Sequence, residues 1–369
     1  ANRKNITSFA RGIPSPDILP IARLNKELVR AVRELPGSGV NYEPLQGNER
    51  LRSQVAKRSL SWKGNLTEED IITSSGCING IAYCLMVLTK RGDKIAVESP
   101  CFYGTLQLAN GLGLEVLEIP TSPATGMDPD ALRKTIRKEK IKACILVSNF
   151  NNPLGSLMPD EHKKETVRLL EQYQVPLIED DLYGDLYFGN SRPVCCKSFD
   201  ESGNVLLCSS FSKTLAPGCR VGWVAPGKYK ESVLRMKLSN ALFCTSLTHE
   251  TIAGFLENGR YDAHLRQLRQ TLHTNFLQFV RVISQSFPEG TKISRPQGGL
   301  SVWVELPKKI NTMDLYEEAL RHKVSFSPGE LFTLKKQFTN HMRLGYGMLW
   351  TDKTESALRT IGKLATAGL

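Results

Sequence analysis

Short apolar runs alternate with longer stretches of mixed hydrophobic and polar residues from about residue 45 to residue 226. The runs have the length of buried strands, and the longer stretches have the apolar spacing of helices. We predict strands at residues 71–75, 94–98, 143–148, 177–179, 205–209 and 221–224, and helices at 78–90, 128–136 and 160–174. Strands that are apolar almost throughout, separated by helices, indicate a mostly parallel sheet covered on both faces. This is the doubly wound α/β class, whose sites lie beyond the carboxyl ends of the strands.

The pattern changes after residue 258. A long Arg-rich helix is predicted at 261–287, followed by strands at 301–305 and 342–345 and a closing helix at 353–364. This order predicts a second, smaller α+β domain at residues 259–369, after a large domain at residues 41–258. Residues 1–40 contain four prolines. They are predicted to form an arm and one helix that join the smaller domain without a core of their own.

Composition narrows the class of protein. The chain is 41% hydrophobic and 23% charged, which is typical of a globular protein. It has no apolar run of about 18 residues and no apolar signal segment after its first five residues, so we expect neither a membrane protein nor a secreted one. The nine cysteines lie in or beside apolar runs, without Cys-x-x-Cys or His-Glu-x-x-His, so no metal site is expected. Cysteines used as small apolar residues indicate a reducing compartment, and we expect the cytoplasm.

The net charge is +11, from 48 basic and 37 acidic residues. Such a balance is compatible with nucleic acid, a membrane surface or anionic ligands. The densest basic run, residues 133–140, is interpreted as the solvated end of a helix.

The most specific stretch is residues 209–223, which follow a predicted buried strand. Lys213 therefore lies in a loop at the carboxyl end of a strand. A lysine there can form a Schiff base with an aldehyde cofactor once burial and neighbouring cations lower its pKa. Ser210, Ser212 and Arg220 add two hydroxyls and a guanidinium that suit a phosphate. The alternative is an ordinary polar turn with a surface lysine, which would be the usual interpretation of a lone Ser-x-Lys.

Three polar residues follow other predicted strands. Asp180 stands at a strand end, where a carboxylate can keep a pyridine nitrogen protonated, and the hydroxyl of Tyr183 can reach the phenolate oxygen of the same ring. Asn152, in an Asn-Pro-x-Gly turn, can donate to that oxygen. Taken singly, an acidic residue at a strand end is often a helix cap, and Asn-Pro-x-Gly is a frequent turn.

The remaining candidates are weaker when taken one at a time. Gly76 opens a helix after a strand, where the backbone N–H groups of Cys77 and Ile78 are free to bind a phosphate. Phe102 follows another strand and can stack on a flat cofactor, although an aromatic beside a proline more often packs. Arg343, on a late strand, can hold a substrate carboxylate; the alternative is a strand-edge arginine in water.

Together these stretches resemble the fold-type-I family of pyridoxal 5'-phosphate enzymes, the class I and II aminotransferases, over nearly the whole chain. The resemblance implies a Schiff base at Lys213, pairing of Asp180 with the pyridine nitrogen, and an α-amino acid and a 2-oxo acid as substrates. The other implied contacts are Asn152 and Tyr183 with the ring oxygen, Phe102 on the ring, Gly76, Cys77, Ile78, Ser210, Ser212 and Arg220 with the phosphate, and Arg343, Asn152 and Gly12 with the substrate.

Two details of the resemblance bear on the site. Many members have Ala-Gln where this chain has Cys77-Ile78, which affects only a side-chain contact because backbone amides can still bind the phosphate. Tyr42 resembles the tyrosine that reaches the phosphate of the neighbouring subunit. This implies a homodimer with shared active sites.

A subgroup is more similar still. The strings IEDDLYGDLYFG, LLCSSFSKTLAPGCRVGWVAPG and GRYDAHLRQLR resemble the aminotransferase-like domain of MocR-type regulators in the GntR family. In those regulators an N-terminal winged helix-turn-helix binds DNA, and this chain shows no such segment. We therefore expect an effector domain that contacts DNA only through an N-terminal domain outside this chain. The alternatives are a stand-alone aminotransferase with no DNA-binding role, and a β-lyase or decarboxylase on the same scaffold.

Overall fold

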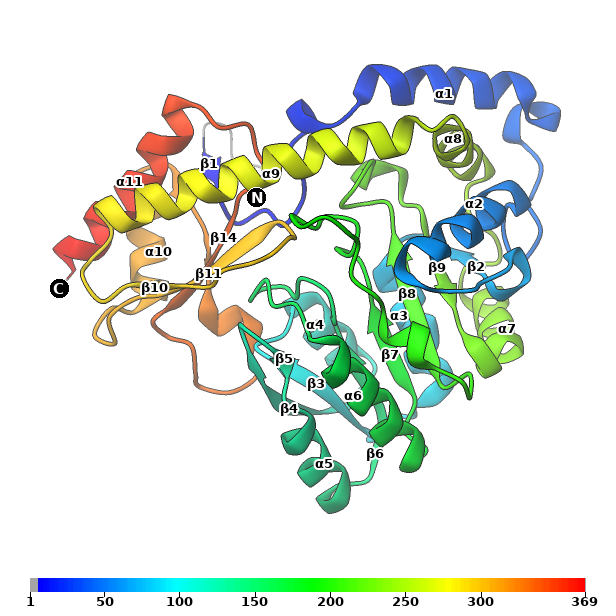
Figure 1. The fold of residues 1–369 in the computed structure, drawn as a ribbon, viewed down its shortest axis with the longest axis horizontal. Coiled ribbons are helices and arrows are strands. Elements are labelled where there is room, and N and C mark those ends of the chain that lie inside the picture. Colours follow the sequence, from blue (N-terminus) through cyan, green and yellow to red (C-terminus); the bar gives the residue numbers. More distant parts are fainter. Residues whose placement is uncertain (1–5, 369) are drawn as a thin grey trace.

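A computed structural model describes residues 6–368 of the protein (Figure 1). Its largest sheet has eight strands in the order β2-β9-β8-β7-β6-β3-β4-β5. The strands are β2 (Ile72–Ser74), β3 (Lys94–Ser99), β4 (Glu115–Ser122), β5 (Gly126–Met127), β6 (Ile141–Leu146), β7 (Leu177–Asp180), β8 (Val205–Ser210) and β9 (Gly222–Ala225). Pairing is parallel from β4 through β3, β6 and β7 to β8, whereas β9 and β5 pair antiparallel to their neighbours. The predicted mostly parallel sheet is confirmed.

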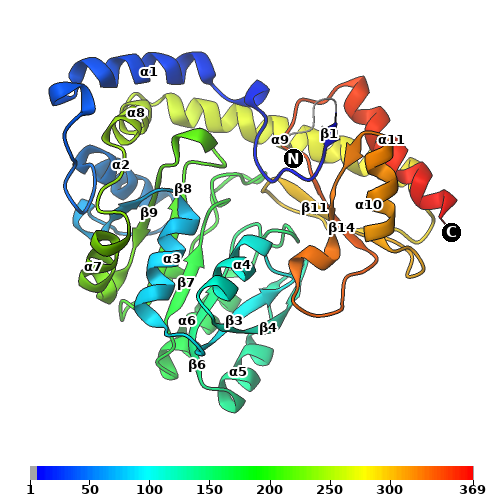
Figure 2. The ribbon, with the colours of Figure 1, turned by 180° about the vertical axis from the view of Figure 1, so that it is seen from behind.

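Helices cover both faces of this sheet. Figure 2 shows α3 (Cys77–Leu88), α4 (Tyr103–Gly111) and α7 (Lys230–Asn240) on one face, and Figure 1 shows α5 (Pro129–Lys138) and α6 (Asp160–Gln172) on the other. The side chains of β6 alternate accordingly: Ala143 and Ile145 pack in the core under α3, whereas Cys144 and Leu146 pack under α5 and α6. Burial on both faces explains why these strands are apolar almost throughout, as the doubly wound class requires.

A second, four-stranded antiparallel sheet has the order β10-β11-β14-β13. Its strands are β10 (Lys292–Ile293), β11 (Ser301–Glu305), β14 (His341–Gly345) and β13 (Ser327–Pro328), and the accompanying helices are α9 (Arg260–Ser286), α10 (Thr312–Arg321) and α11 (Asp352–Ala367). The long helix α9 belongs to two cores: Tyr261 and Leu265 pack beside the large sheet, and Phe279 and Val282 pack beside the small one. The domain boundaries at residues 40 and 258 stay a prediction.

The N-terminal segment joins these parts. Strand β1 (Thr7–Ser8) pairs in parallel with β12 (Val324–Ser325), and α1 (Ile21–Glu34) packs against α8 (Ser246–Glu257), next to α2 (Glu49–Ser59). Short 3-10 helices lie at Pro16–Ile18, Pro36–Gly39, Leu60–Trp62, Glu68–Asp70, Cys196–Phe199, Pro217–Cys219, Gly227–Tyr229 and Gly329–Phe332. Within residues 6–368, no helix is both long and apolar enough to cross a membrane.

The predicted elements differ from the observed ones mainly at their ends. The helix expected at 160–174 stops at Gln172, because Gln174 adopts a left-handed φ of 54°. The helix expected from residue 128 begins as anticipated: the Asp128 carboxylate accepts hydrogen bonds from the N–H groups of Asp130 and Ala131. Helices α2, α4, α7, α8 and α10, strand β4 and the two-residue strands β1, β5, β10, β12 and β13 had no counterpart in the sequence analysis. β4 contains Pro120, which suits its place near the sheet edge but not the alternation that marks a strand.

Phe9 holds the arm in the core of the small sheet. It is fully buried, its ring is 5.5 Å from the ring of Phe279 in an edge-to-face contact, and its backbone bonds to Ser325 and Gly345. We predict that Phe9→Ala lowers the free energy of unfolding by ~3–5 kcal/mol, measured by urea denaturation followed by circular dichroism. The control is Leu277→Ala, also apolar but 54% exposed on α9, for which a change within about 0.5 kcal/mol is expected. Equal losses in the two variants would contradict this role.

Candidate active site

Side chains from three separate parts of the chain meet at the carboxyl edge of the large sheet. Asp180 ends β7, Lys213 follows β8 by three residues, and Asn152 lies in the turn after β6. These strands are parallel neighbours, so their carboxyl ends lie at one edge. Arg343 of β14 reaches the same place from the small sheet and donates to Asn152 Oδ1 at 2.9 Å. The arm completes the group, because the Gly12 carbonyl accepts a hydrogen bond from Lys213 Nζ at 2.7 Å.

Lys213 has the electrostatics of a reactive amine. Burial, followed by the nearby charge of Arg343, lowers its pKa to about 8, although Asp180 acts in the opposite direction. A larger fraction of the amine is therefore neutral near pH 7 than for an exposed lysine. The neutral form is the one that attacks a carbonyl or accepts a proton.

Helix α9 fixes the residue next to Lys213. Tyr261 Oη donates to Thr214 Oγ1 at 2.7 Å, and His264 Nε2, also 2.7 Å away, donates to the Thr214 carbonyl. Both partners come from the first turns of α9, so the loop that carries Lys213 is held from outside the sheet. The sequence analysis missed this contact, because nothing in the pattern of α9 distinguishes these two residues from core positions.

Asp180 is also perturbed by burial, which raises its pKa to about 6. Its Oδ1 accepts a hydrogen bond from the Cys77 thiol at 3.3 Å, and the neighbouring Asp181 carboxylate adds to the upward shift. A carboxyl in this state gains from a cationic N–H partner, which would stabilise its charged form. The thiol contact of Cys77 was not anticipated, since the sequence analysis considered only its backbone.

Asn152 links two other candidates. Its Nδ2 donates to Tyr183 Oη at 3.3 Å, while its Oδ1 accepts from Arg343. Burial, together with the Asp180 charge, raises the pKa of Tyr183, so its hydroxyl stays protonated as a hydrogen-bond donor. These contacts orient the amide and the phenol toward the same region as Lys213.

Arg343 is buried, which lowers its pKa, and its guanidinium is only partly satisfied. Nη2 donates to the Ala10 carbonyl at 2.5 Å and to Ser327 Oγ at 3.1 Å, whereas Nε has no partner within the described part of the chain. A Cβ on Gly12 would lie 3.4 Å from Arg343 Nη1, so the arm passes close to this cation. A buried guanidinium bonded mainly to neutral groups is suited to a carboxylate ligand.

The turn before α3 and the loop after β8 form a set of donors. Arg220 Nη2 donates to the Ser75 carbonyl at 3.0 Å, and a Cβ on Gly76 (φ 97°) would lie 2.5 Å from the same nitrogen, so the turn requires glycine. Helix α3 begins at Cys77, so its first N–H groups have no acceptor within the helix.

Ser210 Oγ accepts from the Ser212 N–H at 3.3 Å, and the buried Ser212 Oγ has no partner among residues 6–368. This orphaned hydroxyl, the helix start and Arg220 are the donor set that a phosphate group needs. The residues present therefore fit a phosphate-bearing cofactor.

Three candidates are less closely tied to this group. Phe102 lies directly before α4, with its ring 4.6 Å from that of Tyr103, and Ile78 lies partly exposed in the first turn of α3. Tyr42 is 82% exposed and stacks on Phe243 at 4.7 Å. The structure thus places Tyr42 on the surface.

A buried network of ion pairs lies next to Asp180 and fixes the loop that follows it. Arg192 bridges Asp181, directly after Asp180, and Asp185, to which its Nε donates at 2.6 Å. Asn149 donates to Asp181 from the other side at 2.8 Å. The sequence analysis did not single out these residues, because their pairing depends on a loop that returns to the strand end.

Comparison with known proteins agrees with this geometry. A family model described as "Aminotransferase class I and II" matches residues 6–361. The uncharacterized HTH-type transcriptional regulators YjiR and YdcR of Escherichia coli (strain K12) are 37% and 34% identical to this chain. The alignments cover 97% and 98% of this chain and 76% and 77% of those proteins.

Among solved structures, LysN, the α-aminoadipate aminotransferase of Thermus thermophilus, complexed with N-(5'-phosphopyridoxyl)-L-leucine, superposes with a TM-score of 0.92 at 27% identity. The superposition covers 99% of this chain and 93% of LysN. The chain therefore belongs to the class I and II aminotransferase family, with the type I fold of enzymes whose cofactor is pyridoxal 5'-phosphate.

Proposed function

We propose that this aminotransferase domain transfers the amino group of an α-amino acid to a 2-oxo acid, with Lys213 as its catalytic residue. One observation carries the proposal: a buried amine with a pKa of about 8 stands beside the Asp180 carboxyl and the Arg343 cation. Pyridoxal phosphate, when bound, supplies an aldehyde that condenses with amines and a ring that withdraws electrons from the substrate Cα.

Each neighbour of Lys213 has a role that follows from its contacts. Arg343 would hold the substrate carboxylate, assisted by Asn152, with the Gly12 segment closing over it. Asp180 would pair with the pyridine nitrogen, and Tyr183, with Asn152, would donate to the ring oxygen. The phosphate would bind Ser210, Ser212, Arg220 and the turn Gly76-Cys77-Ile78, with Phe102 against the ring. The Lys213 amine, whose pKa of about 8 leaves a fraction of it neutral at physiological pH, can take up and return the proton of the substrate Cα.

We further propose that the domain serves as the effector domain of a GntR/MocR-type transcriptional regulator, with the amino acid as its signal. Two relatives above 30% identity are named HTH-type transcriptional regulators, and their alignments leave about a quarter of each relative outside the match. DNA would be contacted through that outside part. The second candidate, a stand-alone aminotransferase, is favoured by the fold shared with LysN.

For the location of the protein we propose the cytoplasm. All nine cysteines are free in the structure, which suits a reducing compartment.

We also propose a homodimer in which Tyr42 reaches the phosphate site of the partner subunit. Tyr42 is 82% exposed and stacks on Phe243, and the nearby Val40 and Leu242 are 83% and 51% exposed, so these side chains are available to a partner subunit. Sedimentation equilibrium should give twice the mass of 41.1 kDa. A monomer under all conditions would contradict shared sites.

Lys213→Ala should abolish covalent capture of the cofactor and keto-acid formation, because it removes the buried amine that lies beside Asp180 and Arg343. In the wild type, borohydride reduction followed by peptide mass spectrometry should locate a pyridoxyl group on Lys213. Lys134→Ala, an exposed lysine on α5, is the matched control and should behave as the wild type. A pyridoxyl group captured equally by the Lys213→Ala protein would overturn the assignment.

The rate at which the apoprotein captures pyridoxal phosphate should rise with pH through a midpoint near 8, because the amine reacts in its neutral form. Arg343→Gln removes a charge that lowers the Lys213 pKa, so the midpoint should move to higher pH. Stopped-flow absorbance over pH 6–10 measures it, with the exposed Arg321→Gln as control. An unchanged midpoint in Arg343→Gln would show that the two charges are not coupled.

Catalysis and sensing differ in turnover. The loaded protein is titrated with a panel of L-amino acids and then with excess 2-oxoglutarate, while absorbance and keto acid are followed. A sensor should respond spectrally to one or a few amino acids with less than one keto acid formed per protein. Many keto acids per protein would identify a working aminotransferase and favour the second candidate.

A further inference from the structure

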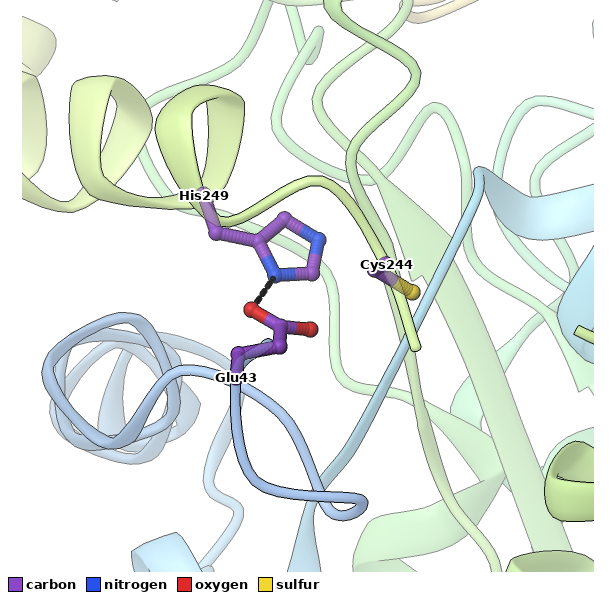
Figure 3. A group of neighbouring side chains, drawn as sticks. All are labelled: Glu43, Cys244 and His249. Atoms are coloured by element: carbon purple, nitrogen blue, oxygen red, sulfur yellow. Dashed lines mark hydrogen bonds and ion pairs between the residues drawn. The ribbon is translucent and has the colours of Figure 1, made fainter. Parts of the chain in front are cut away.

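A second cluster of reactive side chains lies outside the residues assigned above. Glu43 precedes α2, Cys244 lies between α7 and α8, and His249 is in the first turn of α8 (Figure 3). One polar atom of each lies within 4.8 Å of the others. The His249 imidazole is in the middle: its Nδ1 is 2.9 Å from Glu43 Oε2, and its Nε2 is on the side of the ring that faces Cys244. A thiol beside an imidazole that a carboxylate orients is the arrangement of an activated nucleophile.

The cluster contains buried polar atoms without partners. His249 Nε2 and Glu43 Oε1 are both buried and make no hydrogen bond within residues 6–368, and both side chains are more than nine-tenths buried. Leaving such atoms unpaired is costly, so the imidazole nitrogen that faces the thiol gains from receiving its proton. The orphaned nitrogen thus points to chemistry at the sulfur.

The surrounding charges favour a thiolate. Burial acts to raise the pKa of Cys244, but the His249 imidazole and the Lys237 ammonium outweigh it, and the net pKa is below the usual value. Burial acts to lower the pKa of His249, but Cys244 and Glu43 outweigh burial, and the net pKa of His249 is raised. Lys237 is buried, which lowers its pKa, and its Nζ donates to Thr73 Oγ1 at 3.2 Å.

The remaining groups around the sulfur agree with this balance. The hydroxyls of Thr73 and Ser75 donate to Cys244 Sγ at 4.0 Å, and the phenol of Tyr83 also interacts with this thiol. The charge of Arg52 acts on Lys237, whose pKa it helps to lower. Thiolate, imidazolium, carboxylate and ammonium sum to zero charge. A divalent cation placed among them would add positive charge beside Lys237, so the balance favours a free thiolate over a metal ligand.

Cys244 differs from the other cysteines of the chain. Seven of the nine are buried, and only Cys244 and Cys219 have intermediate exposure. Burial raises the pKa of Cys219, whereas that of Cys244 is lowered. Cys219 is therefore an internal reference that has the same intermediate exposure within one chain but lacks the activating neighbours.

We propose that Cys244 is a reactive thiolate and the site at which small soft electrophiles modify this protein. In the reaction, the sulfur electron pair forms a bond to the electrophilic carbon and the leaving group departs with its own pair, so no oxidant or reductant is required. The modified sulfur would stand beside Ser75, whose carbonyl accepts from Arg220 in the donor set described above. The proposal does not depend on the transamination proposed for Lys213.

The test is competitive alkylation of the loaded protein with limiting iodoacetamide from pH 6 to pH 10, with each cysteine quantified by peptide mass spectrometry. At pH 7, Cys244 should react severalfold faster than Cys219, because a larger fraction of its thiol is ionised. Its rate should also level off at a lower pH. Equal rates, or the pH profile of an ordinary thiol, would overturn the proposal. So would a stoichiometric metal ion whose removal is needed before Cys244 reacts.

His249→Gln should slow the alkylation of Cys244 and move its pH profile upward while leaving Cys219 unchanged. His322→Gln, at an exposed histidine directly after α10, is the matched control. Circular dichroism establishes whether each variant is folded. If His249→Gln does not fold, the comparison of Cys244 with Cys219 in the wild type still decides. Unchanged Cys244 kinetics in folded His249→Gln protein would contradict activation by the imidazole.

Discussion

The in-register parallel pairing of β7 with β8 is the constraint on which the candidate site depends. Asp180 is opposite Cys208 in this pair, five residues before Lys213. Because both strands run in the same direction, the carboxyl at one strand end and the amine after the other emerge at the same edge. An antiparallel pairing would send these residues to opposite edges. The antiparallel β9 returns the chain so that Arg220, just before it, meets the turn of Gly76.

This edge becomes a site only when other elements enclose it. Lys213 owes its lowered pKa first to burial and then to Arg343, which belongs to a different sheet. The arm contributes the Gly12 and Ala10 carbonyls, and α9 holds Thr214. The amine is therefore tuned by three segments that do not belong to the strands that position it. Because the arm packs over Lys213, the stability of the docked arm and the pKa of this lysine depend on each other.

The Cys244 cluster illustrates a second way of stabilising buried charge. Around Lys213, the cations outnumber the carboxyl of Asp180, and an anionic ligand can balance the excess positive charge. Around Cys244, four groups of alternating sign balance one another without a ligand. Both clusters border the turn at Ser75 and Gly76, one through the Cys244 sulfur and the other through Arg220.

The local pattern determined the class of the fold and placed the main candidate residues at strand ends, whereas the roles proposed for them follow from the resemblance of the motifs taken together. Apolar strands such as the one predicted at 205–209 could be recognised directly because burial on both faces favours apolar residues throughout, and Asp180, Lys213 and Asn152 could be placed because each follows such a strand. The tertiary structure decided what no local pattern records. It showed that the Cys77 thiol contacts Asp180, that the Gly12 carbonyl receives the Lys213 amine, and that Arg192 neutralises Asp181. It also brought Glu43, Cys244 and His249 together. These contacts join residues far apart in the chain, and their energies depend on burial and mutual orientation, which exist only after the chain has folded.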